Sequence, residues 1–380
     1  MKKIAIAAFA ALAFIGSAFA EITLSFSNKL YEEDPIWIKE GDESSTDFPA
    51  LWEKMSVEIE SEKVDAAIEG KFAIDDWDEK HFGLQGEVSD WYIEFRPIEI
   101  LTLAMHDNIY SQGSYLPIYD DNLSGGNIGS DGFTVVVRPN QFDKALRIAL
   151  TAPFSFGGED DTDGINYFNG KKEDGEDENF HIGAGFIFAQ EKFEIGATFQ
   201  NLPCSDDRLI GVSVAFPTLF GVNEGLNVGL GFTNAKGKDA GFDDLVKEDF
   251  GVIGENILNL AVTFEKDAFS CAAEVVFDLD DKNDDNSADI YDLYAALNFG
   301  YAINEQLGVG LTGKVLTDLN SDTSKIYKTA FEIGVNADYQ LDEHNSFGVE
   351  FDYFMTTIDN TDDKTDISAI KVPVYWKWSL

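Results

Sequence analysis

Along most of the chain, apolar residues alternate with polar or small residues with a period of two, in stretches of about ten residues. The pattern begins at Ile22, Leu24 and Phe26 and ends at Trp376 and Trp378. No helical period of comparable length interrupts it. Alternation of this kind is typical of strands that bury one face, so the sequence predicts an all-β protein of about eighteen strands, with sixteen as the alternative.

The connections between these stretches alternate in length, long then short. Tight links such as Gln190–Lys192 and Ile303–Gln306 follow every second stretch. The long segments fall at about residues 32–50, 75–87, 107–131, 157–179, 233–256, 280–289, 318–327 and 357–368. A soluble β-sandwich has no reason to sort its loops this way, whereas a membrane barrel has short periplasmic turns and long external loops. The sequence therefore predicts a transmembrane antiparallel β-barrel with both termini at the short-turn end.

The first twenty residues have the layout of a secretory signal peptide. Lys2 and Lys3 precede an apolar run over residues 4–15, and the small residues around Ala20 follow. The run is too short to span a bilayer as a helix. We expect cleavage between Ala20 and Glu21, which leaves a single domain over residues 21–380.

The charge balance narrows the classes of partner. The chain has 27 Lys and Arg against 70 Asp and Glu, a formal net charge of −43, which argues against contact with nucleic-acid phosphates. Two cysteines exclude a disulfide scaffold, and no cluster of Cys and His suggests structural zinc. Acidic disordered chains have few aromatic residues, but this chain has 31 phenylalanines. We therefore expect a folded protein with much of its acid in the long segments.

The signal peptide, the alternating strands and the closing segment 370–380 together resemble the bacterial outer-membrane β-barrels, and by size the porins, with a spirochaete-type relative left open. The resemblance implies contact with outer-membrane lipid, and a last strand read by the barrel-assembly machinery through Val374, Trp376 and Trp378. It also implies a homotrimer. Leu380 stands where that family usually has phenylalanine. Pro373 fits only where its missing donor falls at an edge or a bulge.

The longest connection, residues 107–131, is the third in the long series. In porins the third loop folds into the lumen, so the resemblance implies a constriction whose carboxylates concentrate cations, with arginines opposite. The alternative is an exposed surface loop. The residues predicted to line the constriction are Tyr115, Asp120, Asp121, Arg138 and Arg147.

One acidic segment has the oxygen spacing of a calcium-binding loop. Side-chain oxygens at loop positions one, three, five, nine and twelve are the ligands of such a loop. Asn286 replaces the turn glycine, and the flanks are expected strands rather than helices. The alternative is a solvated acidic hairpin tip, and no other cofactor is expected. The candidate ligands are Asp281, Asn283, Asp285, Asp289 and Asp292.

These features predict an outer-membrane porin that passes small hydrophilic solutes and ions through a water-filled barrel, with a preference for cations. An enzyme is not expected, because the four histidines are scattered and none has an identifiable nucleophile beside it. Three alternatives stay open. One is a structural or adhesin barrel that binds ligands through its acidic loops. Another is a transporter of hydrophobic compounds, which would need an apolar lumen. The third, outside the outer-membrane barrels, is a secreted acidic β-protein.

Overall fold

The computed structural model of the protein describes residues 21–30, 36–40, 43–46, 51–75, 83–106, 109–111, 127–129, 132–143, 145–153, 183–200, 208–218, 225–236, 256–279, 293–317, 327–360 and 363–379. Nearly all of them lie in β-strands, and a short 3-10 helix spans Asn140–Phe142. No helix in the described part of the chain is long and apolar enough to cross a membrane.

The strands of the first half of the chain differ widely in length. They are β1 (Glu21–Leu30), β2 (Trp37–Glu40), β3 (Glu43–Ser45), β4 (Leu51–Glu60), β5 (Val64–Asp75), β6 (Gly83–Ile98), β7 (Leu101–His106), β8 (Ile109–Ser111), β9 (Asn127–Gly129), β10 (Gly132–Val137), β11 (Leu146–Pro153) and β12 (Gly183–Gln190).

The strands of the second half are longer on average. They are β13 (Phe193–Gln200), β14 (Arg208–Phe216), β15 (Leu226–Lys236), β16 (Asn256–Lys266), β17 (Phe269–Asp278), β18 (Leu293–Ala302), β19 (Leu307–Thr317), β20 (Tyr327–Gln340), β21 (Asn345–Asn360), β22 (Asp363–Lys371) and β23 (Val374–Ser379).

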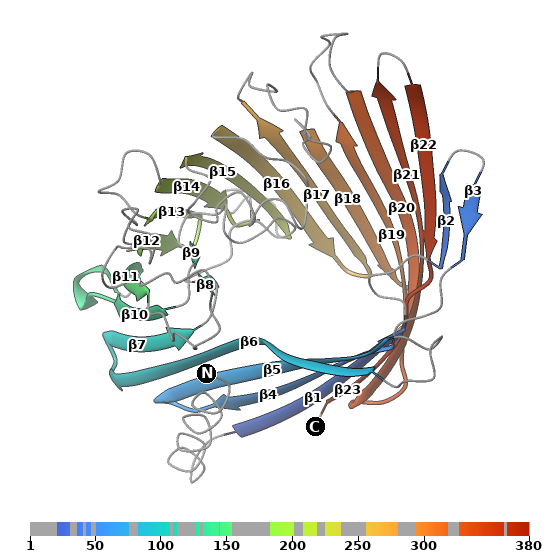
Figure 1. The fold of residues 1–380 in the computed structure, drawn as a ribbon. Coiled ribbons are helices and arrows are strands. Elements are labelled where there is room, and N and C mark those ends of the chain that lie inside the picture. Colours follow the sequence, from blue (N-terminus) through green and yellow to red (C-terminus); the bar gives the residue numbers. More distant parts are fainter. Residues whose placement is uncertain are drawn as a thin grey trace, which may run out of the picture.

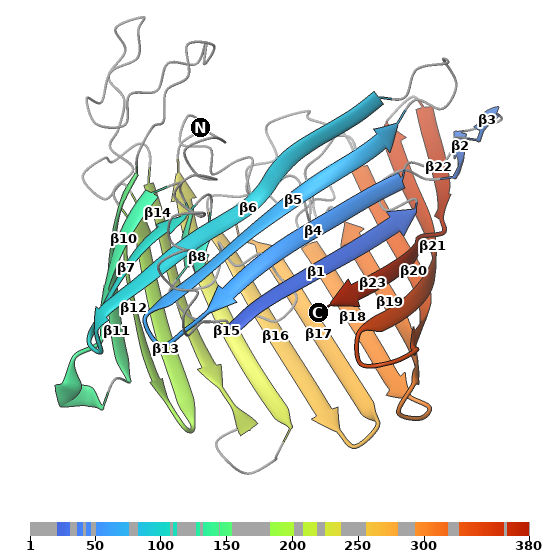
Figure 2. The same ribbon diagram turned by 90° about the horizontal axis from the view of Figure 1, so that it is seen from below.

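The strands form a closed ring (Figures 1 and 2). Each wall strand from β4 to β21 pairs antiparallel with the next wall strand, and β1 closes the ring by pairing with both β4 and β23. The last wall strand consists of β22 and β23, which both pair with β21, and β2 continues the line of β1 along β22. The result is an eighteen-stranded antiparallel barrel, so the predicted fold and strand count are confirmed.

The predicted alternation of connection lengths holds with two exceptions: the β14–β15 connection, residues 217–225, is longer than the β13–β14 connection, residues 201–207, and the β21–β22 connection is short. β12 and β13 are joined by two residues, and a similar short turn joins β20 to β21. The predicted long segment 357–368 is wrong, because β21 continues to Asn360 and β22 starts at Asp363. Threonine favours extended backbone, and Thr357 donates to Asp366 across this hairpin at 2.9 Å, so the ladder continues beyond the apolar alternation.

Pro373 breaks the last wall strand. Its carbonyl accepts a hydrogen bond from the Glu350 N–H at 2.9 Å, but it has no N–H to return. The register on β21 does not shift there, since Asp352 pairs with Lys371 and Val349 with Val374. On the other side the register changes from Leu30↔Val374 to Trp37↔Ile370, so the first strand has more residues than the last at this height. The proline therefore lies at an irregularity of the seam, as its chemistry requires.

The outer face of the barrel is apolar. On most strands, every second described side chain is apolar and directed outward, and many of these residues are partly or largely exposed. A ring of aromatic contacts lies near the short turns, including Phe188 with Phe142 and Phe193, and Phe347 stacked on Trp376. An apolar band bordered by aromatic residues is the surface that a barrel presents to lipid. Representative exposed residues are Phe133, Leu150, Ile195, Val212, Leu230, Leu260, Leu297, Leu311, Val335 and Phe351.

Candidate pore lumen

The inward-facing side chains divide the lumen into two regions. On β7 to β18 most described inward residues are buried, for example Thr102, Thr151 and Thr233, each 1 % exposed or less. On β19 to β21, β23, β1 and β4 most are partly exposed, as Lys314 and Lys54 are. The water-accessible part of the described wall therefore lies on the second region.

A row of hydroxyl groups runs along the buried region. Thr134 Oγ1 lies 2.7 Å from His106 Nε2 and 2.5 Å from Thr151 Oγ1, and all three residues are buried. His106 ends β7 and faces inward near the long-connection end of the barrel. These bonds join three neighbouring strands on the inside of the wall.

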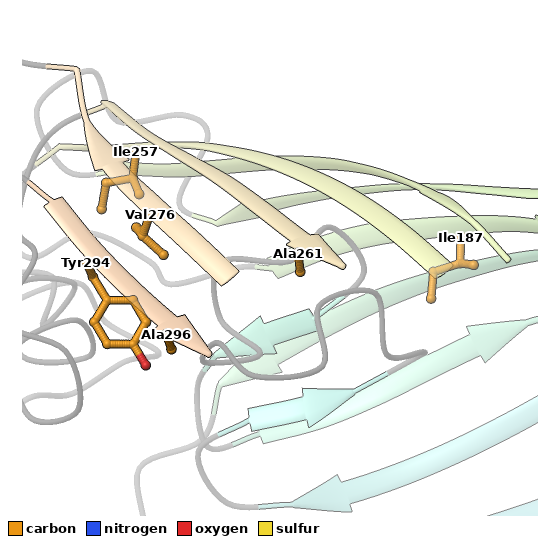
Figure 3. Close-up of a cluster of buried hydrophobic side chains, with 6 residues drawn as sticks. All are labelled: Ile187, Ile257, Ala261, Val276, Tyr294 and Ala296. Carbon is orange, nitrogen blue, oxygen red and sulfur yellow. The ribbon is translucent and has the colours of Figure 1, made fainter. Parts of the chain in front are cut away.

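An apolar patch lies farther along the buried region (Figure 3). Its residues are at most 5 % exposed, although the strand register turns them inward. The water-filled barrel expected from the sequence therefore has an apolar inner patch on this wall, because burial favours side chains without polar atoms. The patch consists of Ile187, Ile257, Ala261, Val276, Tyr294 and Ala296.

Beside this patch, a carboxylate is held within the wall. Glu274 on β17 is 1 % exposed, and its Oε1 accepts a hydrogen bond from Asn259 Nδ2 on β16 at 2.6 Å. Glu274 Oε2 and Asn259 Oδ1 are buried without a hydrogen-bond partner. The pair lies away from the water-accessible wall, so it contributes to packing rather than to the lining of the path.

Part of the third long connection lies inside the ring. β8 and β9 pair as a small separate sheet, and Figure 1 shows them within the barrel outline. β9 lies against β12 and β13, whose inward residues Gly183, Gly185 and Gly196 are buried. Glycines leave room for another backbone to approach closely. Tyr115, Asp120 and Asp121 lie outside the described residues, so their role in a constriction stays a prediction.

The two arginines predicted to face that constriction are bound to the wall at the short-turn end. Arg138 follows β10 and donates to Thr102 Oγ1 at 2.5 Å. Arg147 on β11 lies 4.0 Å from the Glu194 carboxylate on β13. Both point inward, as the strand pattern predicts, but on the β7–β13 side of the barrel and at its short-turn end.

Ion pairs line other parts of the inner wall. Lys54 Nζ is 3.3 Å from Glu69, and Lys314 Nζ is 3.0 Å from Glu332. Arg96 forms ion pairs with Asp65 and Glu94 near the turn between β4 and β5. Each pair joins neighbouring strands or residues of one strand, so it stabilises the wall and also places charged groups on its inner surface.

A cavity of about 770 Å³ lies along β16 to β20 near their short turns. Three carboxylates line it, those of Glu265, Asp267 and Asp338, and no Lys or Arg is among its described lining residues. The inward residues beside them are small or neutral, which keeps this part open. They include Thr263, Ser270, Asn298, Gly300, Gly308, Gly310, Thr312 and Asn336.

The other predicted sites receive no structural description. Ala20 and all five candidate calcium ligands, Asp281 to Asp292, lie outside the described residues, and Glu21 begins β1. Among the described side chains, no three His, Cys, Asp or Glu residues gather as a metal site. The calcium loop and the cleavage site therefore stay predictions.

Several side-chain contacts within the wall were not predicted from the sequence. The bonds of Thr134, the Asn259–Glu274 pair and the Lys314–Glu332 pair all join different strands. Strand alternation identifies their inward direction, and that signal was present in the sequence. Their partners depend on the register between strands, which alternation alone does not give.

Comparison with solved structures supports the fold along the whole chain. OccK2 (OpdF) of Pseudomonas aeruginosa, solved in complex with glucuronate, matches with a TM-score of 0.56 and 10 % identity over 95 % of this chain and 98 % of its own. OpdK of the same species, solved with vanillate, matches at 0.54 and 12 % over 95 % and 99 %. OccAB4 of Acinetobacter baumannii matches at 0.53 and 10 % over 95 % and 98 %.

No protein-family model matches the chain, and no curated protein sequence matches it. The likeness to these structures is thus one of fold, and OpdK is described as an outer membrane protein. The closed barrel, its apolar outer band and these neighbours together define an outer-membrane β-barrel of the porin fold.

Proposed function

We propose that the protein is a passive diffusion channel of the outer membrane for small hydrophilic solutes and ions. The observation that carries the proposal is the water-accessible inner wall, where Lys54, Lys314 and Asp338 face a lumen enclosed by eighteen strands. Charged side chains directed into an enclosed lumen are typical of barrels that pass water and solutes. They also argue against a transporter of hydrophobic compounds.

The proposed solutes are small polar molecules. Two of the structural neighbours were solved with such compounds, OccK2 with glucuronate and OpdK with vanillate. Diffusion through a wetted lumen needs no reaction, and for this reason we propose a channel rather than an enzyme. No cofactor is needed for this function, and calcium at Asp281 to Asp292 would serve only to order an acidic connection.

We further propose a preference for cations. The support comes from the large cavity, whose described lining includes Glu265, Asp267 and Asp338 and no basic residue. Carboxylates along a narrow water-filled path raise the local concentration of cations and repel anions. The net charge of −43 adds to the same field at the mouths of the barrel.

The test is electrical. Refolded protein in a planar bilayer should give stepwise currents in symmetric KCl, and its reversal potential in a KCl gradient should have the sign of cation permeation. Asp338→Asn should move that potential toward zero. Glu343→Gln is the matched control, because Glu343 lies in the exposed turn between β20 and β21 and its side chain is 86 % exposed. Absence of current steps would overturn the channel, and an anion-selective potential would overturn the preference.

We also propose that β23 is the segment read by the barrel-assembly machinery and that the barrels associate as trimers. Support for the first lies in β23 itself, which closes the ring on β1 and carries Val374, Trp376 and Trp378 in alternation. Removal of residues 374–380 should prevent insertion into the outer membrane. Cross-linking of the inserted protein, with monomer as the contradicting result, tests the trimer.

A further inference from the structure

Tyr375 lies flat against the inner wall at the seam of the barrel. It pairs on β23 with Gly348 of β21, and Gly348 pairs with Asp338 of β20. The Tyr375 hydroxyl donates to Asp338 Oδ1, two strands away, so the phenol ring crosses over Gly348. Asp338 Oδ2 accepts a second hydrogen bond, from Asn336 Nδ2 at 3.2 Å.

The ring is held on both faces. A Cβ at position 348 would overlap the Tyr375 ring and hydroxyl, so glycine alone lets the ring lie on the wall. Lys377 Nζ lies 4.7 Å from the centroid of the same ring. An ammonium group at this distance from a phenol ring is attracted to it. The Tyr375 ring therefore lies between Gly348 of the wall and the ammonium group of Lys377.

Two cavities with different charged linings lie on either side of this residue in the strand register. The 770 Å³ cavity includes Asn336 and Asp338, and its described charged lining residues are all acidic. A second cavity of about 340 Å³ lies one row farther toward the short turns, with Gln340, Ser346 and Lys377 in its lining. Its charged residues are Lys54, Lys377 and Glu69, beside a set of serines. In the strand register, Gly348 and Tyr375 lie between the two linings.

We propose that Tyr375 is the residue that determines the width and charge of the path between these two cavities. Packed on Gly348 and against Lys377, the ring stays on the wall between an acidic lining and one that carries Lys54, Glu69 and Lys377. If the ring leaves the wall, it enters the lumen. If the ring is removed, the path between the two cavities widens and Lys377 loses the ring that it contacts. This inference rests on the proposed channel function.

Three substitutions separate these roles by single-channel recording in planar bilayers. Tyr375→Ala should raise the conductance, because it removes the ring between the cavities. Gly348→Ala should lower it, because the new Cβ forces the ring off the wall and breaks its bond to Asp338. Tyr375→Phe should leave the conductance near that of the unmodified protein but shift the reversal potential further toward cation permeation, because Asp338 loses a donor.

Tyr339→Ala is the matched control, since Tyr339 follows Asp338 on β20 but is directed outward and is 42 % exposed. It should leave both quantities unchanged. If the unmodified protein conducts and the variants at 375 and 348 behave like this control, the role of Tyr375 is overturned while the channel stands. If the unmodified protein gives no current steps, the proposed function itself fails. Gly348→Ala keeps the test valid should Tyr375→Ala not fold.

Discussion

Thr134 shows how much one inward hydroxyl contributes to the wall. It is fully buried and bonded to both His106 and Thr151, so each partner depends on it for a buried hydrogen bond. Removing one member of a buried bonded set costs more than the bond itself contributes, because the remaining groups have already lost their water.

We therefore expect Thr134→Val to lower the free energy of unfolding by about 1–3 kcal/mol. Valine has nearly the shape of threonine but no hydroxyl. Urea unfolding of the refolded barrel in lipid, followed by tryptophan fluorescence, measures the change. Thr134→Ser keeps the hydroxyl and should retain more of the stability. Equal losses in the two variants would show that the methyl group, rather than the hydroxyl, stabilises this row.

Substitution of Glu274 should leave the conductance and the ion selectivity of the channel unchanged. Its side chain is buried, its partner Asn259 lies beside it in the wall, and neither residue lines the acidic cavity. Glu274→Gln keeps the acceptor that faces Asn259, so conductance and reversal potential should not change. A shift as large as that of Asp338→Asn would show that Glu274 faces the permeation path.

The turn between β20 and β21 depends on Asp342. Its Oδ1 accepts hydrogen bonds from the His344 and Asn345 N–H groups, each at 2.8 Å, and from the Asn345 side chain. The Asn345 side-chain bond and then the His344 N–H bond lower the pKa of Asp342 below its ordinary value of 3.8. The folded turn thus favours the carboxylate form.

The lowered pKa of Asp342 determines how the stability of the folded protein changes with pH. The stabilisation is complete above the ordinary pKa of 3.8 and is lost as the pH falls through the lower value of the folded state. Asp342→Asn should be less stable than the unmodified protein at neutral pH, and the difference should shrink in acid. Urea midpoints over a pH series measure it, with Glu343→Gln as control. A difference that persists unchanged in strong acid would contradict this account.

Strand existence could be predicted well from the sequence, and strand ends less well. Alternation identified nearly every wall strand, because a barrel between lipid and lumen imposes a two-residue period. The length of the β21–β22 hairpin was not predicted, because Thr357 and Asp366 continue the strand pairing beyond the last residues of the apolar alternation. The strands β2, β8 and β9 were not predicted either, because strands of three or four residues are too short to show the two-residue alternation.

The lumen was harder to predict than the wall. Alternation correctly directed Arg138 and Arg147 inward, but it could not show which inward residues are buried. That depends on what else occupies the lumen, as β9 does beside β12 and β13. Resemblance suggested that the third long connection enters the barrel, and the position of β8 and β9 agrees with it.

At the scale of the whole molecule, closure of the ring should resist detergent. Every wall strand has two hydrogen-bonded neighbours, so no edge is left from which unfolding can begin easily. Unboiled protein in dodecyl sulfate should migrate differently from boiled protein, as barrels commonly do. A chain lacking residues 374–380 has no β23 to pair with β1 and should lose this difference. Identical migration of the full-length protein in both states would argue against a closed barrel.

The seam described at Pro373 has a consequence for how fast the barrel forms. All other wall pairs join strands that are neighbours in sequence, but β1 with β23 and β2 with β22 join the two ends of the chain. Contacts between distant segments carry the largest loop-closure entropy and form slowly. The proline and the change of register divide this closure into two short runs of pairs. The rate of folding should therefore be determined at the seam, and substitutions there should alter folding time more than substitutions in the hairpins.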